Sequence, residues 1–229
     1  MPYFFYGIGN GGWGFLIAIM LLSTLPQMLV RAQFSKYSRV PSDRRITGAQ
    51  VAAAIMRDNG ISAAVQHVGG TLSDHYNPRT NTLGLSSGVY DSASVAALGI
   101  AAHEVGHLMQ KESGYVPLKI RTAIVPVVNL GSMLAMPLFL IGIIMGMMNL
   151  AWLGILLFCG VLAFQLVTLP VEFNASRRAM EALTGNGYIS EEELPLVRKV
   201  LSAAALTYVA AALASLLQIL RLVGMTRRK

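Results

Sequence analysis

The class of this protein follows from two stretches without charge, TAIVPVVNLGSMLAMPLFLIGIIMGM at residues 122–147 and LAWLGILLFCGVLAFQLVTLP at residues 150–170. Each stretch is long enough to cross a membrane as a helix, which takes about 20 mainly apolar residues. Basic residues precede the first stretch and follow the second, whereas the short linker between them has no charge. We therefore expect a transmembrane hairpin over residues 118–170.

Two further apolar runs lie at residues 13–30 and 200–220. The second is the less apolar because it contains serine, threonine, tyrosine and glutamine, so it could cross the membrane or pack against other helices. The whole chain is 54% hydrophobic and only 13% charged, which is too apolar for an ordinary soluble protein. We expect a mainly α-helical membrane protein with three or four transmembrane helices.

Basic residues lie on one side of the first apolar run, because residues 1–12 contain no lysine or arginine and residues 31–45 contain several. The positive-inside rule therefore puts the N-terminus outside and residue 31 onward in the cytoplasm. A cleaved secretory signal would carry basic residues before its apolar run, so we interpret residues 1–30 as a retained membrane anchor. If the apolar helix within residues 190–229 also crosses the membrane, the basic tail that follows it ends outside, against the rule.

The net charge of +7 does not indicate a nucleic-acid partner. The basic residues cluster beside apolar runs, where cationic side chains meet the anionic headgroups of the lipid bilayer. Cys159 is the single cysteine and lies in an apolar run, so the chain offers neither a disulfide nor a thiolate metal site. Any metal must therefore be bound by histidine and carboxylate ligands.

Residues 31–117, between the first and second apolar runs, have the pattern of a small α+β domain. Thr47 and the pair Asn59-Gly60 predict the two ends of one helix. Alternating apolar residues in AVQHV, TLSDHY and TLGLS predict short strands, the last two joined by a turn at residues 77–81. We interpret the last strand, residues 82–86, as an edge strand that could bind an extended substrate.

The segment His103-Glu104-Val105-Gly106-His107 lies in a second predicted helix of this domain, which begins after the cap residues Asp91-Ser92. Histidines four residues apart share one face of a helix and can bind one cation. Glu104 lies near that metal without pointing at it, where its carboxylate can take a proton from zinc-bound water. The segment predicts one zinc ion per chain, with His103 and His107 as ligands and Glu104 as the catalytic base. The alternatives are a chance match and a histidine pair in a proton or ion pathway.

The third protein ligand should be a glutamate, because neither histidine nor aspartate occurs after His107. The glutamates available are Glu112, Glu172, Glu181 and Glu191 to Glu193. The first lies at the end of the same helix, and the last three are explained as the acidic first turn of another helix. Glu181 shares its helix face with arginines, whereas Glu172 shares its face with small residues that let another helix approach. We therefore predict Glu172 as the ligand, in a helix over residues 171–189 that Pro170 opens.

Three motifs resemble the YugP family of bacterial membrane zinc metallopeptidases, and the resemblance covers essentially the whole chain. The motifs are SDHYNP at residues 73–78, AAHEVGHLMQ at residues 101–110 and PVEFNASRRA at residues 170–179. The resemblance implies a zincin-like catalytic domain of the gluzincin type in a bacterial cell (inner) membrane, which acts on peptides or proteins. It also implies zinc ligands at His103, His107 and Glu172, with Glu104 as the base. The positive-inside rule puts the site of this domain on the cytoplasmic face.

More distantly, the layout is similar to the HtpX-like and CAAX prenyl-type membrane proteases, whose third ligand is a glutamate that follows a membrane hairpin. The HtpX-like pattern places an aspartate four residues after that glutamate, where it orients a ligand histidine. Here the corresponding residue is Ser176. Ser176 and a backbone carbonyl are the alternatives for this orienting contact.

The predicted reaction is hydrolysis of peptide bonds by zinc-bound water that Glu104 deprotonates. A further hydrogen-bond donor must stabilise the oxyanion, and His75 in SDHYNP is the first candidate for this catalytic role. The other candidates are Tyr76, Arg177, Arg178 and Tyr188. The alternative function is a catalytically silent, zinc-stabilised membrane scaffold or adaptor, which would have no use for Glu104. The sequence indicates neither the particular substrate nor the oligomeric state.

Overall fold

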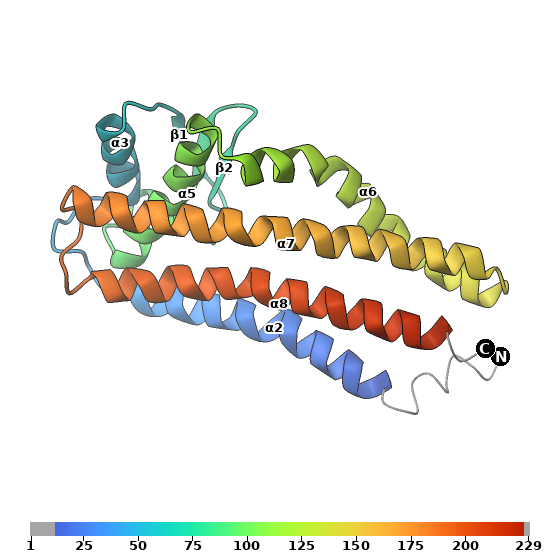
Figure 1. The fold of residues 1–229 in the computed structure, drawn as a ribbon. Helices are drawn as coiled ribbons and strands as arrows, with labels where there is room; N and C mark the ends of the chain where they lie inside the picture. The colour runs from blue at the N-terminus through green and yellow to red at the C-terminus, as the bar shows by residue number, and fades with distance from the viewer. Residues whose placement is uncertain (1–11, 227–229) are drawn as a thin grey trace. The chain divides into compact units, whose positions relative to one another are not determined.

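The computed structural model describes residues 12–226 of the chain. Two segments lie outside the described residues: residues 1–11 and residues 227–229 of the basic tail. The predicted orientation used the absence of basic side chains from the first of them. The described chain is mainly helical (Figure 1). Its longest helices are α2 (Gly12–Tyr37), α6 (Val116–Ile144), α7 (Met148–Gly185) and α8 (Leu194–Thr226). All four are long and apolar enough to cross a membrane.

Helix α7 combines two elements that the sequence predicts as separate. The helix predicted to begin at Pro170 is instead the continuation of the second apolar stretch, so that predicted start is wrong. A proline inside a helix removes a single backbone hydrogen bond, and long apolar helices tolerate this loss where neighbouring groups compensate. As a result, one continuous helix carries both the apolar stretch and Glu172.

The described chain forms two compact units. One unit consists of the residues before Met28, residues 120–169 and the residues after Leu206, which are the most apolar parts of the four long helices. Its buried cluster includes Phe139 and Leu222. A Cβ atom at Gly154 would lie 2.6 Å from the carbonyl oxygen of Ala135, so the backbones of α6 and α7 are in direct contact there. Such close approach at small residues is typical of helices that pack within a membrane.

The other unit contains a small sheet of three strands, β1 (Ala64–Val68), β2 (His75–Asn77) and β3 (Thr82–Ser86). The order is β1-β3-β2, with β1 parallel and β2 antiparallel to β3. The prediction that residues 82–86 form an edge strand is therefore wrong. The turn at residues 77–81 folds β2 back along residues 82–84 of β3, and β1 pairs along the other side of residues 82–86, so β3 is the central strand.

Two helices of this unit begin with side-chain caps. In α3 (Gly48–Asp58), the Thr47 hydroxyl accepts the Gln50 N–H at 3.2 Å and the Gln50 side chain accepts the Thr47 N–H at 2.8 Å, which confirms the predicted start. The predicted cap of α5 (Val95–Glu112) is wrong, because Ser94 is the cap and accepts the Ala97 N–H at 3.2 Å. The short helix α4 (Ser87–Tyr90) takes up the residues between β3 and this cap.

Helix α5 lies beside α3 and β2 (Figure 1), also contacts β3, and contributes to the largest buried cluster of the described chain. Leu98 and Leu108 of α5 pack there with Ile55 of α3 and with Leu83 and Leu85 of β3, and all five side chains are fully buried. Interiors of this kind are close-packed and resist displacement of any one element. This packing fixes the position of the helix that carries the histidine pair.

Candidate metal centre

Helix α5 presents His103 and His107 on one face, one turn apart. Their imidazole rings meet edge to face, with ring centroids 4.8 Å apart. Glu104 lies on the same helix and is 9% exposed, so its carboxylate is largely withdrawn from bulk solvent. The predicted base therefore lies in a buried environment next to the histidine pair.

Helix α7 supplies the carboxylate that faces both rings. The Glu172 Oε2 atom lies 3.3 Å from His103 Nε2 and 3.6 Å from His107 Nε2. One ligand atom from each of these three residues lies within 4.8 Å of the other two. Ligand atoms about 2.0–2.1 Å from a tetrahedral zinc ion lie roughly 3.4 Å from one another. Both the chemistry and the spacing of this donor set therefore fit a zinc ion.

Helices α5 and α7 come this close because of Gly106, which lies inside the histidine-pair segment. A Cβ atom at this position would lie 2.5 Å from the carbonyl oxygen of Ala175 on α7. Ala175 and Ala179 are fully buried, so the predicted close approach along the small-residue face of Glu172 is confirmed. The glycine thus sets the distance at which Glu172 meets the two histidines.

Gly106→Ala is expected to push α7 away from α5, because a backbone carbonyl cannot move aside as a flexible side chain can. Overpacking of this kind costs about 1–3 kcal/mol in the free energy of unfolding, and here it would also separate the three ligands. Thermal unfolding and zinc content of the purified protein measure both effects. The matched control is Gly185→Ala, where an added Cβ meets nothing within 4 Å. Equal behaviour of the two variants would contradict this account of Gly106.

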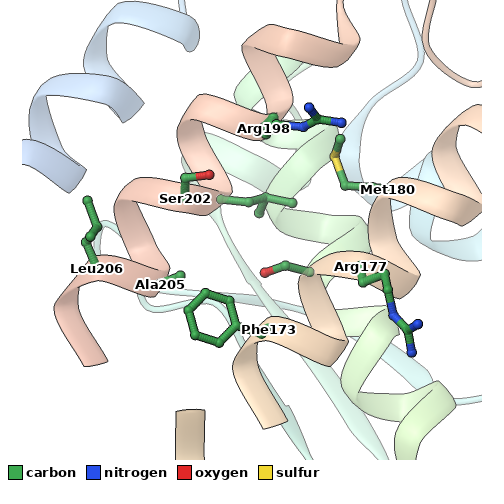
Figure 2. Close-up of a pocket in the computed structure, with 9 residues that line it drawn as sticks. Phe173, Arg177, Met180, Arg198, Ser202, Ala205 and Leu206 are labelled. Carbon is green, nitrogen blue, oxygen red and sulfur yellow. The ribbon is translucent and has the colours of Figure 1, made fainter. Parts of the chain in front are cut away.

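Ser176 contacts His103 on the side of the ring that faces away from Glu172. The Ser176 Oγ atom lies 3.1 Å from His103 Nδ1, the ring nitrogen on the side opposite the one that faces Glu172. The sequence left Ser176 and a backbone carbonyl as alternatives for the contact that orients this histidine. In the described residues, His103 Nδ1 contacts Ser176. Ser176 also lines a groove of about 480 Å³ between α7 and α8. Figure 2 shows its mainly apolar walls, which include Phe173, Met180 and Leu206, together with the guanidinium groups of Arg177 and Arg198.

A buried amide contacts the second histidine, and sequence reasoning missed it. Gln110 is fully buried, and its Oε1 atom lies 3.0 Å from His107 Nδ1. Its Nε2 atom donates to the Val171 carbonyl at 2.7 Å and to Asn174 Oδ1 at 3.0 Å. The signal in the sequence was the spacing of three residues from His107, which places Gln110 on the same helix face.

The other glutamates weighed as ligands lie elsewhere. Glu112 is 3.6 Å from Lys111, and Glu181 is 4.0 Å from Arg177, and both are exposed ion pairs. Glu193 is buried and accepts the backbone N–H groups of Asp43 at 2.9 Å and Ser190 at 2.8 Å. Helix α8 begins after these acidic residues, at Leu194, so the predicted acidic first turn lies just before the helix. The Ser190 N–H contact with Glu193 is one of the two hydrogen bonds of a capping box.

His75 lies on β2 and is not a member of the three-residue cluster. Its Nδ1 atom is 2.9 Å from the carbonyl oxygen of Ser73. A Cβ atom at Gly84 of the neighbouring strand would lie 2.7 Å from its ring, so the imidazole packs across this glycine. The ring is exposed, and its predicted catalytic role stays a prediction.

The other candidate oxyanion donors are engaged by neighbours in the described chain. Tyr76 donates to Asn81 Oδ1 at 2.8 Å, and Tyr188 donates to a carboxylate oxygen of Asp58. Arg178 does not pair with Glu181 as the sequence had suggested. It donates through Nε to Asn174 Oδ1 at 2.9 Å and through Nη1 to the Met109 carbonyl at 3.3 Å.

The charges around His107 favour its protonated form in the absence of metal. Burial opposes the positive charge, but the hydrogen bond with Glu172 and the negative charges of Glu104 and Glu172 outweigh it, and the pKa of His107 is raised above its ordinary value. A metal ion needs the neutral imidazole, so protons compete with the metal for this residue.

Comparison with known proteins places the chain among peptidases. A family model described as "Putative neutral zinc metallopeptidase" matches residues 13–227. The "Putative membrane protease YugP" of Bacillus subtilis (strain 168) is 48% identical over 208 residues, which cover 90% of this chain and 92% of that protein. No solved structure matches the chain.

Proposed function

Because the chain belongs to the neutral zinc metallopeptidase family, we propose that it is a membrane-embedded, zinc-dependent endopeptidase. The observation that carries the proposal is the meeting of His103, His107 and Glu172 within 4.8 Å, with Glu104 on the same helix as the two histidines. We propose these three residues as the ligands of one zinc ion per chain, an arrangement of the gluzincin type in a zincin-like domain. The proposed substrate is a peptide or protein.

Bound zinc would act as a Lewis acid that polarises the scissile carbonyl and makes water acidic enough to lose a proton near neutral pH. We propose Glu104 as the group that receives that proton, because it neighbours His103 on α5 and is not itself one of the three cluster members. The same carboxyl group can then return the proton to the leaving amine, as peptide hydrolysis requires. Its burial keeps competing water away from this transfer.

His75 is the proposed hydrogen-bond donor to the oxyanion, and its surroundings restrict how it could serve. A carbonyl oxygen only accepts hydrogen bonds, so the contact with Ser73 requires a hydrogen on His75 Nδ1. Its Nε2 atom then carries a hydrogen only when the ring is doubly protonated.

The proposed membrane arrangement rests on the four apolar helices and on the distribution of basic residues. We propose residues 1–30 as an anchor, 118–170 as a transmembrane hairpin and 190–229 as a C-terminal apolar helix with a basic tail. Residues 31–117 and 171–189 together would form the catalytic part. By the positive-inside rule the N-terminus lies outside a bacterial cell membrane and the metal centre faces the cytoplasm.

Metal removal tests the proposal. The detergent-purified protein is expected to contain one zinc ion per chain and to cleave an unfolded test protein. A chelator should abolish cleavage, and added zinc should restore it. The alternative function, a zinc-stabilised scaffold or adaptor, predicts that chelation lowers thermal stability while no cleavage of several test proteins is seen before or after. Loss of thermal stability on chelation, without cleavage of any test protein, would refute the peptidase proposal.

A further inference from the structure

We propose that Gln110 is a positioning residue that holds His107 in the tautomer with hydrogen on Nδ1, so that its Nε2 lone pair faces the metal centre. The inference rests on the proposed function in one respect only, that His107 binds a metal. The underlying geometry is a chain of hydrogen bonds between α5 and α7, within one compact unit, in which each donor and acceptor can be assigned.

The orientation of the Gln110 amide follows from the backbone of α7. The Val171 carbonyl can only accept a hydrogen bond, so the Gln110 atom at 2.7 Å from it must be the NH₂ group. The reverse orientation would bring two carbonyl oxygens into repulsive contact. The Gln110 side chain is fully buried, so no water can offer its amide an alternative partner at low cost.

The tautomer of His107 follows from that orientation. The Gln110 Oε1 atom faces His107 Nδ1 at 3.0 Å, and because it is an acceptor, Nδ1 must carry the hydrogen. In the neutral ring the lone pair then lies on Nε2, the atom that faces Glu172 Oε2 at 3.6 Å. The opposite tautomer would leave a buried carbonyl oxygen without a donor, which is unfavourable.

Asn174 and Arg178 of α7 provide a second reason for this orientation of the Gln110 amide. Arg178 has donors only, so its 2.9 Å contact through Nε assigns Asn174 Oδ1 as an acceptor. That oxygen also receives the second hydrogen of the Gln110 amide at 3.0 Å. Arg178 is itself tied to the Met109 carbonyl of α5 at 3.3 Å. Asn174 Oδ1 thus accepts hydrogen bonds from both Arg178 and Gln110, which leaves Gln110 Oε1 as the acceptor that faces His107.

His103 has no equivalent constraint. Its Nδ1 contact is the hydroxyl of Ser176, which can either donate or accept. The two histidines therefore differ: the surroundings of His107 select one tautomer, and the hydroxyl beside His103 adapts to either. Substitution of Gln110 should accordingly affect His107 and leave His103 unchanged.

Nitrogen NMR of isotope-labelled histidine in the metal-free, full-length Glu172→Ala protein tests the tautomer directly, at a pH where His107 is neutral. The Glu172 carboxylate is removed because it would compete with Gln110 for the single ring hydrogen. This protein is expected to show hydrogen on Nδ1 of His107, and addition of Gln110→Met, of similar length but without hydrogen bonds, is expected to give a mixture. Hydrogen on Nε2 in the Glu172→Ala protein, or an unchanged His107 signal on addition of Gln110→Met, would overturn the proposal. This readout does not depend on zinc binding or on peptidase activity.

Zinc affinity, measured by competition with a chelator, is the second readout. Loss of a contact that orients a metal-bound histidine typically lowers affinity about 10- to 100-fold, and we expect that range for Gln110→Met. The control is Leu98→Ala, which empties a fully buried site on the same helix away from the histidines. If both variants lose thermal stability but the control loses as much zinc affinity as Gln110→Met, the role of Gln110 is structural and the proposal fails.

Two substitutions of Asn174 on α7 test whether its acceptor oxygen supports Gln110. Asn174→Asp keeps an acceptor oxygen for both Gln110 and Arg178, so it should lose less zinc affinity than Asn174→Leu. Equal losses would contradict the proposed chain. If His107 shows the expected tautomer and the wild type binds zinc but cleaves nothing, the peptidase proposal alone would be refuted.

Discussion

Glu104→Gln is expected to abolish peptide hydrolysis while the zinc content stays at one ion per chain. The amide has the shape of the carboxylate but cannot accept a proton from water, and loss of a general base typically costs about 100- to 10,000-fold in rate. Zinc should stay bound because the three proposed ligand atoms belong to His103, His107 and Glu172. The measurement is cleavage of an unfolded test protein together with metal analysis of the same preparations.

Glu112→Gln is the matched control for this experiment. Glu112 lies on the same helix, where it forms an exposed ion pair with Lys111, and the chemical change is identical. Exposed pairs of this kind contribute little to stability, so the control should cleave like the wild type. Wild-type cleavage by Glu104→Gln would show that another group is the base. A loss of zinc in that variant would show that Glu104 is needed for metal binding.

Glu172→Ala is expected to lose both zinc and hydrolysis. The substitution removes the single carboxylate of the cluster, whose Oε2 atom lies 3.3 Å and 3.6 Å from the two imidazoles, and leaves two neutral ligands. Zinc sites of catalytic type have three protein ligands, so the remaining pair should not retain the ion through purification. Metal analysis and the cleavage assay measure the two losses.

The control on the same helix is Glu181→Ala. Glu181 is exposed and pairs loosely with Arg177, so its removal should change neither zinc content nor activity. If Glu172→Ala retained full zinc and full activity, the third ligand would have to be another residue. If it retained zinc but lost activity, Glu172 would act in the reaction and not in metal binding.

Several elements of the fold were predictable because their signals are local. Thr47 and Gln50 lie three residues apart and form the predicted helix start. The apolar stretches are long enough to form membrane-length helices whatever their surroundings. The helical period alone placed Glu172 on the same face as the small residues Ala175 and Ala179, and those alanines are buried.

Other elements depended on partners far along the chain. Residues 82–86 have the same pattern whether they form an edge or a central strand, and the pairing with β1 across many intervening residues made them central. Pro170 is a common helix start, but α7 continues through it without a break from Met148 to Gly185. Ser94 became the cap of α5 because α4 used the residues before it.

The histidine spacing, the adjoining glutamate and the absence of later histidines or aspartates made the metal centre a prediction from sequence, since ligand chemistry and helical period need no knowledge of distant contacts. Only the tertiary structure determined which groups contact the proposed ligand residues and the helix that carries them. Gly106 meets a carbonyl of α7, Ser176 meets His103, and Gln110 meets His107 and Val171. The contact of Gln110 with Val171 joins residues 61 positions apart, and that of Ser176 with His103 joins residues 73 positions apart. Close packing of two helices creates them: the small-residue face of α7 predicts that another helix approaches, but not which side chains that helix brings into contact.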